Sequence, residues 1–106
     1  MSKLVDNEWI QNHLDQPMRP GRSAFKQGSP RLSLANGGRI SVQASASHYC
    51  TPKSNTGPYV SVEIYPELKG KSLRLLRDLN SSDNEVWGWV SIDKVVDIIN
   101  ASGGVA

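Results

Sequence analysis

Two stretches of the chain alternate between apolar and polar residues, and this alternation constrains the fold more than any other feature. A period of two residues is that of a β-strand with one buried face. The stretches span residues 31–35 and 39–46, and a turn-forming segment, Asn36-Gly37-Gly38, separates them. The sequence therefore predicts a β-hairpin whose buried face carries Leu32, Leu34, Ile40, Val42 and Ala44.

The length of the hairpin loop decides which residues face each other. A two-residue loop would place a serine opposite an isoleucine and break the apolar face. A three-residue loop at 36–38 instead pairs Leu34 with Ile40 and Leu32 with Val42. We therefore expect a three-residue loop with a glycine in the left-handed conformation.

Three further segments are predicted to be strands. Residues 59–65 alternate, and residues 86–90 are rich in β-branched and aromatic side chains. Residues 72–77 fit either a strand, with Leu73 and Leu75 inward, or a helical turn on Leu73 and Leu76, and we favour the strand. In the segment 59–65 the expected inward residues are Val60, Val62 and Ile64, and the expected outward residues are Tyr59, Ser61, Glu63 and Tyr65.

Both ends of the chain carry helix patterns. Asp6 can cap a first helix, which Pro17 must end. Ser91 can cap a last helix, with Asp93 in its first turn, and Gly103-Gly104 can end it. Apolar residues recur at helical spacing in both, namely Trp9, Ile10 and Leu14 in the first and Ile92, Val95, Val96 and Ile99 in the last.

These elements predict an α+β fold in a single domain, residues 1–106. We expect an antiparallel sheet of about five strands, with the N-terminal and C-terminal helices packed on one face. Residues 17–30 hold prolines, glycines and basic side chains without apolar periodicity, so we expect a basic loop or arm there. A domain this small leaves little room for a deep active site, which excludes a large enzyme fold.

Charge is distributed unevenly along the chain. The formal net charge is +2, but no acidic residue lies between Asp15 and Glu63, while residues 78–106 carry −4. Such segregation steers association with charged partners and says little about fold. The basic residues in the acid-free stretch are Arg19, Arg22, Lys26, Arg31, Arg39 and Lys53.

The residues that could carry chemistry form no strong motif. His48 and Cys50, two apart, point to one side of an extended chain, but a lone cysteine is more often a small buried hydrophobe than a nucleophile. With His13 they make too few ligands for zinc. We expect no enzyme, no metal and no cofactor. A single cysteine and the absence of an apolar run of about 18 residues favour a cytoplasmic protein without a membrane span.

The aromatic residues are the better candidates for function. Tyrosine and tryptophan dominate the energetics of protein interfaces. If the neighbouring valines face the core, Trp87 and Trp89 are exposed on the sheet, and if the tryptophans are buried, Gly88 merely lets a helix approach. Both arrangements stay open. The candidate binding residues are Arg19, Arg22, Lys26 and Arg31 as the charged part and Tyr59, Tyr65, Trp87 and Trp89 as the aromatic part.

Three segments carry a further pattern, namely GGRISVQASASHYCTPK (37–53), GPYVSVEIYP (57–66) and VWGWVSIDKVVDIINASGG (86–104). In these segments the chain resembles a type of small protein found in phages and prophages. The resemblance implies a phage-encoded protein that binds and inhibits a host defence protein, as anti-CRISPR proteins do, in the cytoplasm of the host cell. It supplies no catalytic residue.

Two classes of function therefore follow from the sequence. We rank first a non-enzymatic protein-binding module, directed at a host protein or a protein–nucleic acid complex. The alternative is a nucleic-acid-binding accessory protein, in which bases stack on exposed aromatic rings and the basic arm follows the phosphates. Capture of a small anionic ligand and formation of a homodimer also stay open.

Overall fold

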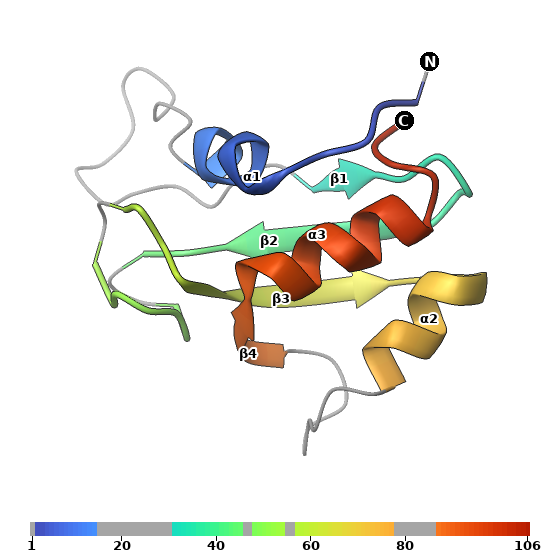
Figure 1. Ribbon diagram of the computed structural model, residues 1–106. Helices are drawn as coiled ribbons and strands as arrows, with labels where there is room; N and C mark the ends of the chain where they lie inside the picture. The colour runs from blue at the N-terminus through green and yellow to red at the C-terminus, as the bar shows by residue number, and fades with distance from the viewer. Residues whose placement is uncertain (1, 15–30, 46–47, 55–56, 78–86) are drawn as a thin grey trace, which may run out of the picture.

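The computed structural model describes residues 2–14, 31–45, 48–54, 57–77 and 87–106. The helices and strands of this part confirm an α+β fold (Figure 1). The predicted arm at 17–30 lies outside the described residues. In chain order the elements are α1 (Asn7–Leu14), β1 (Leu32–Ser33), β2 (Arg39–Gln43), β3 (Ser61–Glu67), α2 (Gly70–Arg77), β4 (Trp87–Ser91) and α3 (Ile92–Ala101).

The described strands form one antiparallel sheet of four strands in the order β1-β2-β3-β4. The expected strand at 72–77 is wrong, because this segment belongs to α2. Its two buried residues, Ser72 and Leu76, are four apart, which is the spacing of neighbours on one helix face. A short apolar run fits both periods, and tertiary packing selected the helical one here.

The hairpin has the expected loop length, but the loop lies one residue earlier than predicted. The N–H of Leu34 bonds to the carbonyl oxygen of Gly38, which leaves residues 35–37 as the loop, and Gly37 has a φ of +90°. The strand pairs are therefore shifted, and Leu32 faces Ile40 instead of Val42. A shift of two keeps the apolar residues on one face.

The core lies between the sheet and α3. Figure 1 shows α3 across the face of β2 and β3, and α3 also contacts α1 and α2. Ser91 caps α3, since its side chain accepts a hydrogen bond from the N–H of Lys94. Gly103 and Gly104 end the helix, both with positive φ. The core residues of α3 are Ile92, Val95, Ile98 and Ile99, and those of β2 and β3 are Ile40, Val42, Val62 and Ile64.

The start of β3 corrects three expectations. Tyr59 is only 2% exposed and Val60 is 69% exposed, the reverse of the predicted alternation, and Ser61, expected outward, is buried. β3 begins at Ser61, so the alternation does not extend to Tyr59 and Val60. Gln11 of α1 binds the backbone of Tyr59 instead, with its Nε2 donating to the carbonyl oxygen (2.7 Å) and its Oε1 accepting from the N–H (2.9 Å). The Tyr59 hydroxyl donates to the carbonyl oxygen of Ser54.

The two ends of the described chain meet beside β1. Lys3 and Val105 exchange two backbone hydrogen bonds of 2.9 and 2.8 Å, and Val105 also pairs with Leu34. Asn100 of α3 fixes the segment that leads into α1, because its side-chain amide bonds both the N–H and the carbonyl oxygen of Val5. These contacts extend the sheet beyond β1 without forming a further regular strand.

Gly104 is predicted to be the glycine most sensitive to substitution in this junction. Its φ is +90°, and a Cβ there would overlap the backbone carbonyl of Lys3. Gly70 is a matched control, because its φ is +60° but nothing lies within 4 Å of a Cβ. We expect Gly70→Ala to lower the free energy of unfolding by about 1–2 kcal/mol, the cost of the left-handed conformation alone. Gly104→Ala should lower the free energy of unfolding, measured by urea denaturation, by about 3–4 kcal/mol. Equal losses for Gly104→Ala and Gly70→Ala would show that a Cβ at position 104 does not clash with Lys3.

Candidate functional site

The predicted charged residues do not form a free positive surface in the described part of the chain. Arg19, Arg22 and Lys26 lie outside the described residues. Arg31 is exposed, but its guanidinium lies 3.6 Å from the carboxylate of Glu67. Arg39, from the facing strand, bonds the same carboxylate at 2.7 Å. The carboxylate of Glu67 thus forms ion pairs with both arginines.

The predicted aromatic residues separate into buried and exposed positions. Tyr59 is buried and is not a surface contact. Tyr65 is 39% exposed and Trp89 is 60% exposed, as a contact surface requires. Trp87 is partly buried and packs against the core. Its indole Nε1 is buried, with no hydrogen-bond partner in the part of the chain that the structure describes.

An irregularity in β4 explains why Trp87 and Trp89 differ. Val90 pairs with Val62, but Trp87 pairs with Ile64, so three steps along β4 match two along β3. This bulge places Trp87 and Val90 on the same, inward side. Trp89 absorbs the extra residue with a φ of +52°, an uncommon conformation for a bulky side chain. The first arrangement is therefore right for Trp89, which is exposed, and the second for Trp87, which is partly buried. The expected helix at Gly88 is wrong, because the residue that approaches Gly88 is Tyr49, which is in no helix.

Tyr49, which the sequence did not single out, lies against Trp89. The ring centroids are 5.0 Å apart, and Tyr49 is 50% exposed. The backbone carbonyl of Tyr49 accepts a hydrogen bond of 2.9 Å from the N–H of Trp89. Gly88 makes this contact feasible, because a Cβ at that position would lie 2.7 Å from the Cβ of Tyr49. The glycine between two tryptophans was the available signal, since glycine in a strand often marks a close approach.

Charged side chains hold this aromatic pair on the sheet. The carboxylate of Glu63 accepts a hydrogen bond of 2.9 Å from the N–H of Tyr49. The ammonium of Lys53 lies 5.7 Å from the centroid of the Tyr49 ring, within the range of a cation–π contact. Tyr65 follows Glu63 by two residues on β3 and so faces the same side. We call this set the aromatic surface: Tyr49, Lys53, Glu63, Tyr65 and Trp89.

His48 and Cys50 are not arranged as a base and a nucleophile. Cys50 is buried, and its sulfur lies 3.2 Å from the carbonyl oxygen of Ser45 and 3.3 Å from that of Pro52. The Nδ1 of His48 instead contacts the hydroxyl of Ser45 at 2.6 Å. The cysteine therefore has the small buried role that lone cysteines usually have.

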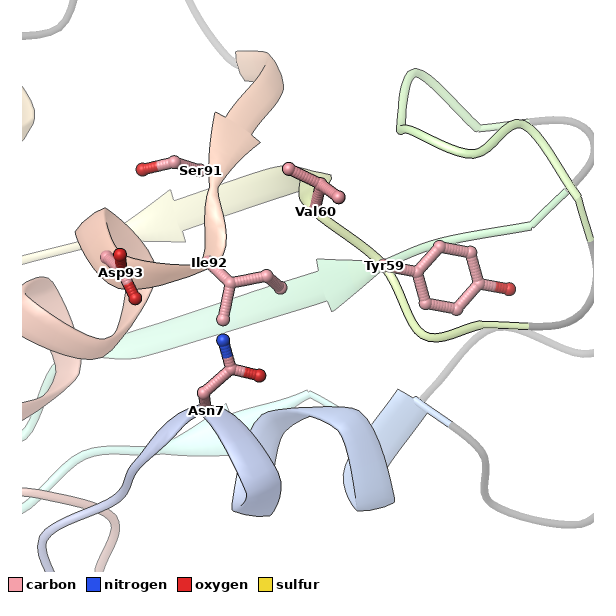
Figure 2. Close-up of a pocket in the computed structure, with 6 residues that line it drawn as sticks. All are labelled: Asn7, Tyr59, Val60, Ser91, Ile92 and Asp93. Carbon is pink, nitrogen blue, oxygen red and sulfur yellow. The ribbon is translucent and has the colours of Figure 1, made fainter.

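One pocket of about 240 Å³ lies between the starts of α1 and α3 (Figure 2). Figure 2 shows the Tyr59 ring directed away from Asn7 and Asp93, so the phenol does not meet the carboxylate. Asp93 is the one ionisable group besides Tyr59 among the described lining residues, which gives the pocket no acid and base pair. Its lining residues are Asn7, Tyr59, Val60, Ser91, Ile92 and Asp93.

Within the described ranges, no three or more histidine, cysteine, aspartate or glutamate side chains are grouped as a metal ion would need. No helix in those ranges has the length and apolar character to cross a bilayer.

Comparisons of the chain with protein-family models, with curated proteins and with solved structures found no match. The resemblance to small phage proteins therefore stays a prediction.

The close contact at Gly88 generates a testable prediction. Gly88→Ala forces its Cβ against that of Tyr49, and we expect the free energy of unfolding to fall by about 1–3 kcal/mol, as in other overpacked sites. In a Tyr49→Gly background the clashing atom is absent, so the same substitution should cost little. Urea unfolding of the four proteins measures the coupling, expected to exceed about 1 kcal/mol. A coupling near zero would show that Tyr49 does not lie on Gly88.

Proposed function

We propose that the protein is a non-enzymatic binding module that contacts a partner protein through the aromatic surface. The proposal rests on Trp89. Its large ring is 60% exposed, and its backbone has a φ of +52°. A bulky residue in this conformation costs on the order of 1–3 kcal/mol, and such strain is concentrated at functional sites. Stability alone would favour glycine at this position.

The aromatic surface is also pre-organised. A backbone hydrogen bond joins Trp89 to Tyr49, and a carboxylate hydrogen bond joins Tyr49 to Glu63. The two rings are in contact before any partner binds. Ordering side chains on binding costs about 0.5–1.5 kcal/mol each, so rings already held in place bind at a lower entropic cost. Tyrosine and tryptophan are also the residues most often found as interface hot spots.

Charge favours a protein over a nucleic acid at this surface. The aromatic surface carries one cation, Lys53, and one carboxylate, Glu63. Nearby on the same side of the sheet, the arginines Arg31 and Arg39 share the carboxylate of Glu67. A phosphate backbone would meet these carboxylates and find few unpaired cations, whereas a protein interface tolerates a mixed polar rim.

The resemblance to phage and prophage proteins supports a more specific form of the proposal. In that form the partner is a host defence protein, and the protein inhibits it by covering its working surface. The aromatic surface supplies the contact, and no chemistry by this chain is required.

Substituting the exposed tryptophan tests the proposal. Trp89→Ala removes the ring, and we expect the free energy of unfolding to change by less than about 1 kcal/mol, because the side chain is mostly exposed. Capture of the partner from a lysate of the source cells, treated with nuclease, should fall at least about 10-fold, as for a hot-spot residue. Leu4→Ala is the matched control, since Leu4 is another large exposed hydrophobic residue.

The proposal requires one protein to be retained in a fixed ratio by the unsubstituted protein and by Leu4→Ala, and to be lost with Trp89→Ala. Equal retention by all three proteins would contradict it. Retention that disappears with nuclease would favour a nucleic acid as the partner.

A further inference from the structure

A second surface, on α2, carries a concentration of positive charge. Residues 68–77 contain four basic residues and no acidic residue. All four basic side chains are exposed, while Ser72 and Leu76 on the other side of α2 are buried. We call these four residues the basic stripe: Lys69, Lys71, Arg74 and Arg77.

The cations of the basic stripe form no ion pair with another described residue. Within the described ranges, neither α2 nor Lys69 forms an ion pair, and the two ion pairs found there both involve Glu67 with Arg31 or Arg39. The basic stripe therefore presents four charges that an external anion can contact.

The carboxylate of Asp93 lies at the other end of β3, whereas that of Glu67, at the end where α2 begins, is paired with Arg31 and Arg39. Ser61, at the start of β3, pairs with Ser91, which caps α3, and Asp93 follows two residues later. α2 begins after Glu67, at the end of β3, and seven strand residues span about 20 Å. Figure 1 shows this arrangement, with the start of α3 and the start of α2 at opposite ends of the arrow for β3. A polyanion on α2 therefore lies away from Asp93.

The chemistry of α2 distinguishes between two kinds of anionic partner. An acidic protein would need an apolar or aromatic anchor, but α2 has no aromatic residue, and its leucines are buried or partly buried. A phosphate backbone needs only cations. Single-stranded nucleic acid would also need rings on which bases stack, which α2 lacks. We propose that the basic stripe binds the phosphate backbone of double-stranded nucleic acid without reading its sequence.

This proposal goes beyond the protein-binding function and does not depend on it. The basic stripe and the aromatic surface share no residue. A partner protein on the aromatic surface and a duplex on α2 can therefore be tested separately.

Salt dependence of duplex binding tests the proposal. We would measure fluorescence anisotropy of a labelled DNA duplex of about 20 base pairs between about 50 and 200 mM salt. Four phosphate contacts predict a slope of log K against log salt of about −3.6. Arg74→Gln/Arg77→Gln should reduce the slope to about −1.8 and weaken binding at least about 10-fold at the lowest salt. The single variant Lys71→Gln should reduce it to about −2.7.

A matched control separates a defined site from overall charge. Lys3→Gln/Lys94→Gln removes the same charge from elsewhere on the described surface, and it should leave the slope unchanged. The side chains of the basic stripe are exposed and have no ion pair in the described ranges, so all variants should keep the unfolding midpoint of the parent protein. Absence of duplex binding, or equal weakening by both double variants, would overturn the proposal. Preferential binding of a poly-glutamate peptide would overturn it in favour of an acidic protein.

Discussion

Four apolar side chains of α3 are buried against β2 and β3, and α1 and α2 both contact α3. α1 has eight residues, too few for a helix to be stable in water by itself. Asn100 attaches it at one end by bonding both backbone groups of Val5. Gln11 attaches its middle by bonding both backbone groups of Tyr59. In both places a side-chain amide makes the two backbone hydrogen bonds, one donated and one accepted, that a neighbouring strand would otherwise make.

In the described part of the chain, α3 covers one face of the sheet, and the opposite face carries the aromatic surface. Residues of β3 alternate, so Val62 and Ile64 face α3 while Glu63 and Tyr65 face away from it. The bulge in β4 then turns Trp89 to the outward side while keeping Trp87 inward. A regular strand would have placed the two tryptophans on one face. The bulge in β4 therefore explains why Trp89, and not Trp87, is exposed beside Tyr49.

The elements with strong local signals were predictable from the sequence. Asp6 and Ser91 cap α1 and α3 as expected, with hydrogen bonds to the N–H groups of Trp9 and Lys94. The inward faces of β2 and of most of β3 also follow from their period of two. The segment 72–77 was wrong because a short apolar run fits both a strand and a helix. The hairpin loop was displaced by one residue because 35–37 and 36–38 both preserve the apolar face.

The candidate site was only partly predictable, because it depends on contacts between distant segments. Tyr65 and Trp89 were identified from residue type and alternation. Tyr49 was missed, since its position depends on a loop that returns to Gly88, almost 40 residues later in the chain. Tyr59 was misplaced for a similar reason, because its burial depends on Gln11. The positive surface of α2 was not predicted, because the sequence analysis favoured a strand for residues 72–77.

Site-specific photo-crosslinking measures the central claim most directly, namely that a protein partner contacts the outward face of the sheet at Trp89. A benzophenone-bearing phenylalanine would replace Trp89 in one protein and the exposed Leu4 in another, both expressed in the source cells. Our account predicts one crosslinked protein from position 89 and none from position 4. Equal crosslinking from both positions, or none from position 89, would contradict it.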